Sequence, residues 1–151
     1  MENTKNITVA LAADHAGYPL KEALIKHLNS RGVNTVDCGT NSTESCDYPD
    51  FAVAGCRKVL DGEASLTILC CGTGIGMSMA ANKLRGIRAA CCSDIFSARY
   101  TRLHNDANVL CLGARVVGEG LACELADAFV DTDFEGGKHK RRIDMISALE
   151  E

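Results

Sequence analysis

The stretch SLTILCCGTGIGMSMAANKL, residues 65–84, decides the fold. Its first seven residues are mostly apolar and are typical of a buried strand. Glycines then occupy positions 72, 74 and 76, and a segment with helical character follows. The stretch therefore predicts a strand, a glycine-rich loop and a helix in direct succession.

Apolar runs and helical patterns alternate along the rest of the chain. Four further strands are predicted at 7–13, 33–39, 86–93 and 107–113. Further helices are predicted at 17–30, 49–60, 94–103, 118–131 and in the basic C-terminal segment from 136 onward. Five apolar strands that alternate with helices predict an α/β fold, with one parallel sheet covered on both faces. Right-handed crossovers would place every strand-to-helix loop at one edge of that sheet, where ligands bind.

The composition is that of a globular protein and argues against some classes of function. The chain has 151 residues, 46% apolar and 24% charged, which predicts one domain spanning 1–151. A formal charge of −4 argues against a nucleic-acid surface, although a local basic cluster can still bind a phosphate. The sequence contains no run of about 18 consecutive apolar residues, so it predicts no membrane span. The polar start MENTKN lacks a signal-peptide core, so we expect a cytoplasmic protein.

The nine cysteines are expected to stay free thiols in a protein without an export signal. No C-x-x-C pair or zinc-finger spacing is present, which disfavours a thiol redox enzyme and a metal site. The adjacent pairs Cys70–Cys71 and Cys91–Cys92 lie in predicted strands, where neighbours point to opposite faces. We interpret all the cysteines except Cys71 as small buried hydrophobic residues.

The loop CGTGIG at 71–76 matches neither common nucleotide-binding motif. A dinucleotide fingerprint needs a glycine where Met77 stands, and a P-loop needs G-K-[ST] after four spacers. A strand–loop–helix turn still exposes backbone N–H groups, which suit a phosphate or the negative oxygen of a reaction intermediate. A tight turn that serves packing alone is the alternative, and this stretch by itself leaves both open.

Cys71 favours the chemical interpretation of this loop. It ends the predicted strand beside N–H groups and a helix N-terminus, which both favour a thiolate. Cys70 is expected to face the opposite side of the sheet, and Thr73 adds a hydroxyl within the loop. A thiolate beside an oxyanion site suits nucleophilic catalysis or proton abstraction. Two cysteines buried for packing remain the alternative.

Other polar residues are candidates for the edges of the sheet. Asp14 and His15 end an apolar strand, where they either form part of a site or cap the next helix. Tyr48 either lines the ligand crevice expected at this edge of the sheet or simply starts its helix. His104 and Asn105 lie between a helix and the last strand, where a histidine is either functional or merely solvated.

Five consecutive basic residues, KHKRR at 138–142, stand out in an acidic protein. Such a run is usually a solvated helix face. It could also clamp a phosphate, for which arginine offers a bidentate fork.

Taken together, these residues resemble the ribose-5-phosphate isomerase type B family, which also includes the galactose-6-phosphate isomerase subunits. The matching segments follow the family's order through nearly the whole chain. They are ADHAGYPLK at 13–21, DCGTNSTESCDYPDFA at 37–52, CGTGIGMSMAANK at 71–83, GIRAACCSD at 86–94, RLHNDANVLCLGARVVG at 102–118 and FEGGKHKRRI at 134–143.

The resemblance implies a Rossmann-like three-layer α/β/α sandwich with a five-stranded parallel sheet. It also implies a homodimer, sometimes paired into tetramers, with the C-terminal helix at dimer contacts. The family needs no metal and no organic cofactor. Its members interconvert aldose and ketose phosphates through an enediolate.

The resemblance further implies roles for individual residues. Cys71 matches the general base that moves a proton between C1 and C2 of the sugar. Some members instead use a glutamate at the position of Met77, which cannot take a proton. The residues that match the loop holding the enediolate oxygen, and so contact substrate, are Gly72, Gly74, Ile75 and Gly76.

The remaining roles concern the sugar ring and the phosphate. His104, helped by Thr73, matches the group that opens the furanose ring, while Asp14 and Asn105 match contacts to the sugar. The family brings residues 104 and 105 in from the neighbouring subunit. Residues that match phosphate ligands are His15, Arg115 and Arg142.

Lys138 stands where many family members have arginine, and it offers the phosphate a point charge in place of a fork. From the resemblance as a whole, we expect an isomerase that interconverts ribose 5-phosphate and ribulose 5-phosphate. The alternatives are an isomerase of a four-carbon, allose or galactose 6-phosphate substrate and a non-catalytic sugar-phosphate sensor.

Overall fold

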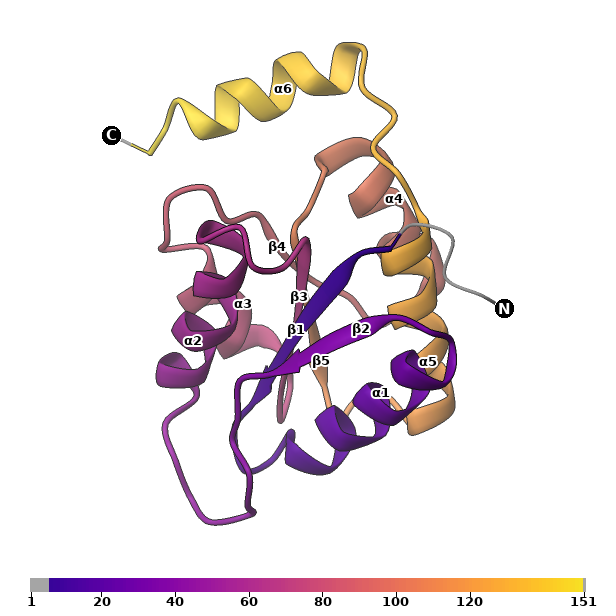
Figure 1. Ribbon diagram of the computed structural model, residues 1–151. Coiled ribbons are helices and arrows are strands. Elements are labelled where there is room, and N and C mark those ends of the chain that lie inside the picture. Colours follow the sequence, from indigo (N-terminus) through magenta and orange to yellow (C-terminus); the bar gives the residue numbers. More distant parts are fainter. Residues whose placement is uncertain (1–5, 151) are drawn as a thin grey trace.

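The computed structural model describes residues 6–150, and in it five parallel strands form one sheet in the order β2-β1-β3-β5-β4 (Figure 1). Most of the polar amino-terminal segment, residues 1–5, and residue 151 lie outside the described part. The strands are β1 (Thr8–Ala13), β2 (Asn34–Asp37), β3 (Leu66–Cys71), β4 (Ala89–Cys91) and β5 (Val109–Gly113). The helices are α1 (Tyr18–Ser30), α2 (Tyr48–Leu60), α3 (Ile75–Ala81), α4 (Ile95–Asn105), α5 (Glu119–Asp131) and α6 (Lys138–Ser147).

Helices cover both faces of the sheet, which confirms the three-layer α/β/α prediction. One apolar cluster joins the sheet to α1, α4 and α5, and a second cluster joins the opposite face to α2 and α3. All six residues of β3 are buried, as expected for the central strand of a parallel sheet. Within β3, Ile68 and Cys70 belong to the first cluster, whereas Leu69 and Cys71 belong to the second. The strand alternation therefore places the two adjacent cysteines on opposite faces, as predicted.

The predicted strand at 86–93 is longer than the strand that forms. Only Ala89–Cys91 pairs with β5, at the edge of the sheet. Gly86, at φ +85°, donates its backbone N–H to the Glu150 carboxylate, and Arg88 N–H is bound by the side chain of Asn108. Side chains therefore take the N–H groups of Gly86 and Arg88. The Arg88 carbonyl still accepts backbone N–H groups of Asn108 and Val109, and regular strand pairing begins only at Ala89.

The strand order decides where a ligand crevice can form. The chain runs from β1 outward to β2 and then returns to β3 on the other side of β1. The order reverses between β1 and β3, and the loops after these two strands diverge there at the carboxyl edge of the sheet. The loop after β1 holds Asp14 and His15, and the loop after β3 begins at Cys71.

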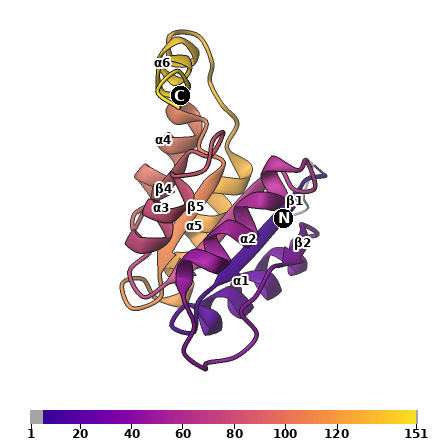
Figure 2. The same ribbon diagram turned by 90° about the vertical axis from the view of Figure 1, so that its left-hand side faces the viewer.

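Helix α6 stands apart from the sheet, beyond the end of α4 (Figure 1, Figure 2). Its Ile143 is buried, while Met145, Ile146 and Leu149 on the same C-terminal segment are exposed. No helix among residues 6–150 is long and apolar enough to cross a membrane.

We predict that Gly17→Ala destabilises the fold by about 2 kcal/mol or more, because of overpacking. A Cβ at Gly17 would lie 2.2 Å from the carbonyl oxygen of Cys70, and both backbones are fixed by the junction of β1, β3 and α1. Gly120, within α5, has nothing within 4 Å of such a Cβ. Gly120→Ala is therefore the control, and it should leave stability unchanged or raise it by up to about 1 kcal/mol. Urea denaturation followed by circular dichroism measures both, and equal midpoints for the two variants would contradict the prediction.

Candidate active site

Cys71 lies at the carboxyl end of β3 with its sulfur against the glycine loop. The residue is 5% exposed, and its Sγ accepts a hydrogen bond from the backbone N–H of Gly74 at 3.1 Å. Cys70 is fully buried on the other face, and burial raises the pKa of its thiol above the ordinary value of 9.0. Only Cys71 of the adjacent pair is therefore placed to act at the crevice.

The glycine loop reaches this geometry through close approach and an unusual backbone conformation. Gly74, which caps α3, has φ +81°, and a Cβ there would lie 2.9 Å from the carbonyl carbon of Leu112. A side chain at this position would push the loop away from β5 and break the hydrogen bond from the Gly74 N–H to the Cys71 sulfur. Thr73 accepts the Ile75 N–H on its Oγ1 at 3.2 Å, so its hydroxyl is fixed at the exposed rim of the loop.

Asp14 directly follows β1, and its backbone N–H donates to the Cys70 carbonyl of neighbouring β3 at 3.2 Å. Its side chain is nearly buried, and Oδ1 accepts the N–H groups of Ala16 and Gly17 at 3.0 and 2.9 Å. Both N–H groups precede α1, whose cap residue Gly17 has no side-chain cap hydrogen bond, so Asp14 orders the turn before the helix and does not cap the helix itself. A carboxylate has two oxygens, so this role and a contact to a sugar hydroxyl are compatible.

His15, beside Asp14, is oriented by the following loop. Its Nδ1 accepts the backbone N–H of Cys46 at 3.2 Å. The neutral imidazole therefore carries its proton on Nε2, which is left to donate.

Two further residues complete the group at the carboxyl edge. The Tyr48 ring lies over Gly76, where a Cβ would come within 2.6 Å of the ring. The exposed Arg115 lies over Gly72 in the same way, with Nη1 3.2 Å from the position of a Cβ, and it donates its backbone N–H to the Gly72 carbonyl. A guanidinium charge therefore stands at the mouth of the loop that holds Cys71.

The structure places the other predicted residues at the opposite edge of the sheet. Helix α4 runs back from the carboxyl edge and ends at His104 and Asn105, beside the start of β5. In the β3–β5 ladder Thr67 pairs with Val109 and Cys71 with Gly113, so β5 starts about 13 Å from the level of Cys71. Lys138 and Arg142 lie on α6, which contacts α4 (Figure 1). Within one chain the predicted residues therefore form two separate groups.

His104 has surroundings that the sequence did not indicate. Its ring stacks on His139, with centroids 4.0 Å apart, and its Nε2 lies 3.5 Å from Oε2 of Glu135. Loss of hydration and then the charge of His104 lower the pKa of His139 below its ordinary value of 6.5, and Lys138 and Arg142 act in the same direction. Glu135 was not among the predicted site residues, and His139 entered only as a member of the basic run 138–142, because their partner lies more than thirty residues earlier in the chain.

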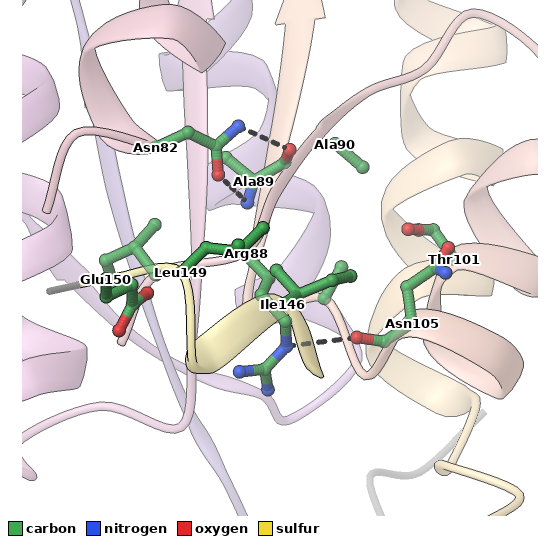
Figure 3. Close-up of a pocket in the computed structure, with 11 residues that line it drawn as sticks. Asn82, Arg88, Ala89, Ala90, Thr101, Asn105, Ile146, Leu149 and Glu150 are labelled. Atoms are coloured by element: carbon green, nitrogen blue, oxygen red, sulfur yellow. Dashed lines mark hydrogen bonds between the residues drawn. The ribbon is translucent and has the colours of Figure 1, made fainter. Parts of the chain in front are cut away.

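A cavity of about 510 Å³ lies between α4 and α6 at this second edge (Figure 3). Its lining joins apolar side chains of the C-terminal segment, Ile146 and Leu149, to Asn105 on α4. Arg88 Nε donates to the Asn105 carbonyl at 3.0 Å, which fixes the end of α4 against the loop before β4. The cavity contains no residue of the Cys71 group.

Comparison with known proteins identifies the family of the chain. The family model described as Ribose/Galactose Isomerase matches residues 9–146. The chain belongs to this family. Ribose-5-phosphate isomerase B of Escherichia coli is 47% identical over 143 residues, which are 95% of this chain and 96% of that protein. Probable ribose-5-phosphate isomerase B of Mycoplasma genitalium is 42% identical over 147 residues, 96% of this chain and 97% of that protein.

Solved structures of the ribose/galactose isomerase family share the fold closely. Ribose-5-phosphate isomerase B of Clostridium thermocellum superposes with a TM-score of 0.94 at 44% identity, covering 95% of this chain and 97% of that one. The Mycoplasma genitalium enzyme, solved with bound ribulose-5-phosphate, gives a TM-score of 0.90 at 42% identity over 95% of both chains.

Proposed function

We propose that this chain interconverts ribose 5-phosphate and ribulose 5-phosphate through an enediolate, with Cys71 as the general base. The observation that carries the proposal is the contact of the Cys71 sulfur with the Gly74 N–H, at the carboxyl edge of a family isomerase fold. The names of the relatives, and the relative solved with ribulose-5-phosphate, support the choice of substrate.

The geometry supports a proton transfer without net redox change. The Cys71 thiolate takes the proton from C2, the electron pair of that C–H bond forms the C1=C2 double bond, and the carbonyl pair becomes the O1 oxyanion of the enediolate. The hydroxyl proton passes from O2 to O1, and the Cys71 thiol returns its proton to C1 as the C2 carbonyl forms, so the reaction balances without an oxidant or reductant. A hydrogen bond from Gly74 N–H stabilises the thiolate form, and backbone N–H groups of the glycine loop would stabilise the developing oxyanion.

The phosphate and the sugar ring need residues from both edges of the sheet. His15 and Arg115 lie in loops at the carboxyl edge, as Cys71 does, whereas His104, Asn105, Lys138 and Arg142 lie at the far edge of the same chain. A homodimer in which the far edge of one subunit meets the Cys71 group of its partner would supply ring opening by His104 and a phosphate clamp from α6. Binding energy at the phosphate would then orient the reacting carbon.

Exposed apolar side chains at both edges support such an assembly. Ile75 and Met79 on α3 are 52% and 66% exposed, and Ile146 and Leu149 on the C-terminal segment are 48% and 83% exposed. Burial of these side chains between subunits would stabilise a dimer, with α6 in the contact. We further propose that dimers pair into tetramers, that each chain forms one isomerase domain and that the protein is cytoplasmic. All nine cysteines are free thiols, which is compatible with a reducing compartment.

A second candidate is an isomerase of another sugar phosphate. Lys138, which stands where many family members have arginine, favours this candidate. The ratio of kcat/KM over a panel of four-, five- and six-carbon aldose phosphates separates the two candidates. A sensor that binds without chemistry would show no exchange of the substrate C2 proton with deuterated water.

We predict that Cys71→Ala lowers kcat by about 10²- to 10⁴-fold, because the transferred proton loses its carrier. Cys70→Ala is the matched control, since this thiol faces the opposite cluster, and it should retain most activity. Circular dichroism and the rate of C2 proton exchange are measured on both variants. Equal losses in the two variants, or no loss in either, would contradict the role of Cys71.

Mixing two inactive variants tests whether sites are shared between subunits. Cys71→Ala and His104→Ala homodimers should each be inactive, but a mixed dimer contains one site with both native residues. After subunit exchange we expect recovery of about a quarter of the native activity, since half the dimers are mixed and each has one intact site. No recovery, despite mixed dimers detected by native mass spectrometry, would place both residues in one chain's site.

Lys138→Met should raise KM for ribose 5-phosphate several-fold and change kcat much less, because the lysine would bind the non-reacting phosphate. Lys140→Met is the control, because Lys140 pairs with Asp144 on its own helix. Steady-state kinetics measure both, and identical KM values would remove Lys138 from the phosphate clamp.

A further inference from the structure

Three potential metal ligands converge where α4, α6 and the segment between α5 and α6 meet. They are His104 at the end of α4, Glu135 before α6 and His139 in the first turn of α6. One ligand atom from each lies within 4.8 Å of the other two, and His104 Nε2 lies 3.5 Å from Glu135 Oε2. Ligand atoms around a tetrahedral zinc ion lie about 3.4 Å apart, so small side-chain rotations would complete the geometry.

The backbone holds the three residues together. Glu135 donates its N–H to the Leu103 carbonyl at 3.0 Å, which fixes the connecting segment against the end of α4. Gly136 and Gly137, both at positive φ, then reverse the chain so that His139 lies beside His104. The edge of the Tyr100 ring packs on His104 with centroids 5.0 Å apart. The cluster therefore arises from three chain segments that are each anchored.

We propose that His104, Glu135 and His139 bind a divalent transition metal such as Zn²⁺, and that the bound metal inhibits the enzyme. Two imidazoles and one carboxylate suit zinc, cobalt or nickel, and three protein ligands leave a further position for water. The bound ion would occupy the His104 nitrogen that ring opening needs. The inhibition rests on the proposed function, whereas the binding does not.

The charges around the cluster set how the ion and substrate compete. Glu135 supplies the negative charge at the site, while Lys138 and Arg142 on α6 oppose a dication. Sugar phosphate and metal would therefore exclude one another, and substrate should protect against inhibition. Isomerisation itself would proceed through Cys71 with the metal site empty.

Binding is tested by titrating the metal-free full-length protein with Co²⁺ and recording its visible d–d absorption. We expect one Co²⁺ per chain in the native protein, with affinity at least about tenfold lower in His139→Ala and Glu135→Gln. Cys71→Ala and His27→Ala control for thiolate and for other histidine sites, and both should bind as the native protein does. Native-like binding by His139→Ala, or loss of binding in Cys71→Ala alone, overturns the proposed site.

Inhibition is tested with Zn²⁺, and each variant's activity is expressed relative to its own rate in EDTA. Zinc should inhibit the native enzyme reversibly, and His139→Ala should need at least about tenfold more zinc for the same loss. Equal zinc sensitivity in the two proteins overturns the inhibitory role. If the native protein shows no isomerase activity even in EDTA, the proposed function fails, while the Co²⁺ titration still decides the metal site.

Discussion

The hydrogen bond from Gly74 N–H to the sulfur of Cys71 is the contact on which the carboxyl-edge site depends. It requires β3 to end at Cys71 and α3 to begin four residues later, with Gly74 in a conformation that places no side chain against β5. The same turn sets Gly76 beneath Tyr48 and Gly72 beneath Arg115. One tight connection therefore fixes the proposed base, its stabilising N–H and two residues at the mouth of the crevice.

Lys21 supports the opposite wall of this crevice from within the fold. Its side chain is fully buried, and its ammonium binds the Asp37 carboxylate at 2.6 Å and the Thr40 carbonyl at 2.7 Å. A buried cation is costly unless it is paired in this way. The lysine thus ties α1 to the end of β2, where the chain enters the loop that carries Cys46 to His15.

The separation of the predicted residues into two edges would link catalysis to assembly if the site is shared between subunits. A strand-to-helix turn and the following helix end lie on opposite sides of a parallel sheet, so one small chain cannot bring Cys71 and His104 together. A shared site would make the dimer necessary for activity and would use the otherwise exposed apolar residues of α3 and α6. The stacked pair His104–His139 at the second edge would then connect ring opening with metal sensitivity.

The sequence by itself determined the alternation of strands and helices, the turn at 71–76 and the opposite orientations of Cys70 and Cys71. These features follow from local periodicity and from glycine, which act over a few residues. Only the tertiary structure decided that β5 lies between β3 and β4, that the strand predicted at 86–93 shortens to Ala89–Cys91, and that His104 lies far from Cys71. The tertiary structure also brings His104 into contact with Glu135 and His139. Such contacts depend on packing between segments distant in the chain, which no local pattern of residues encodes.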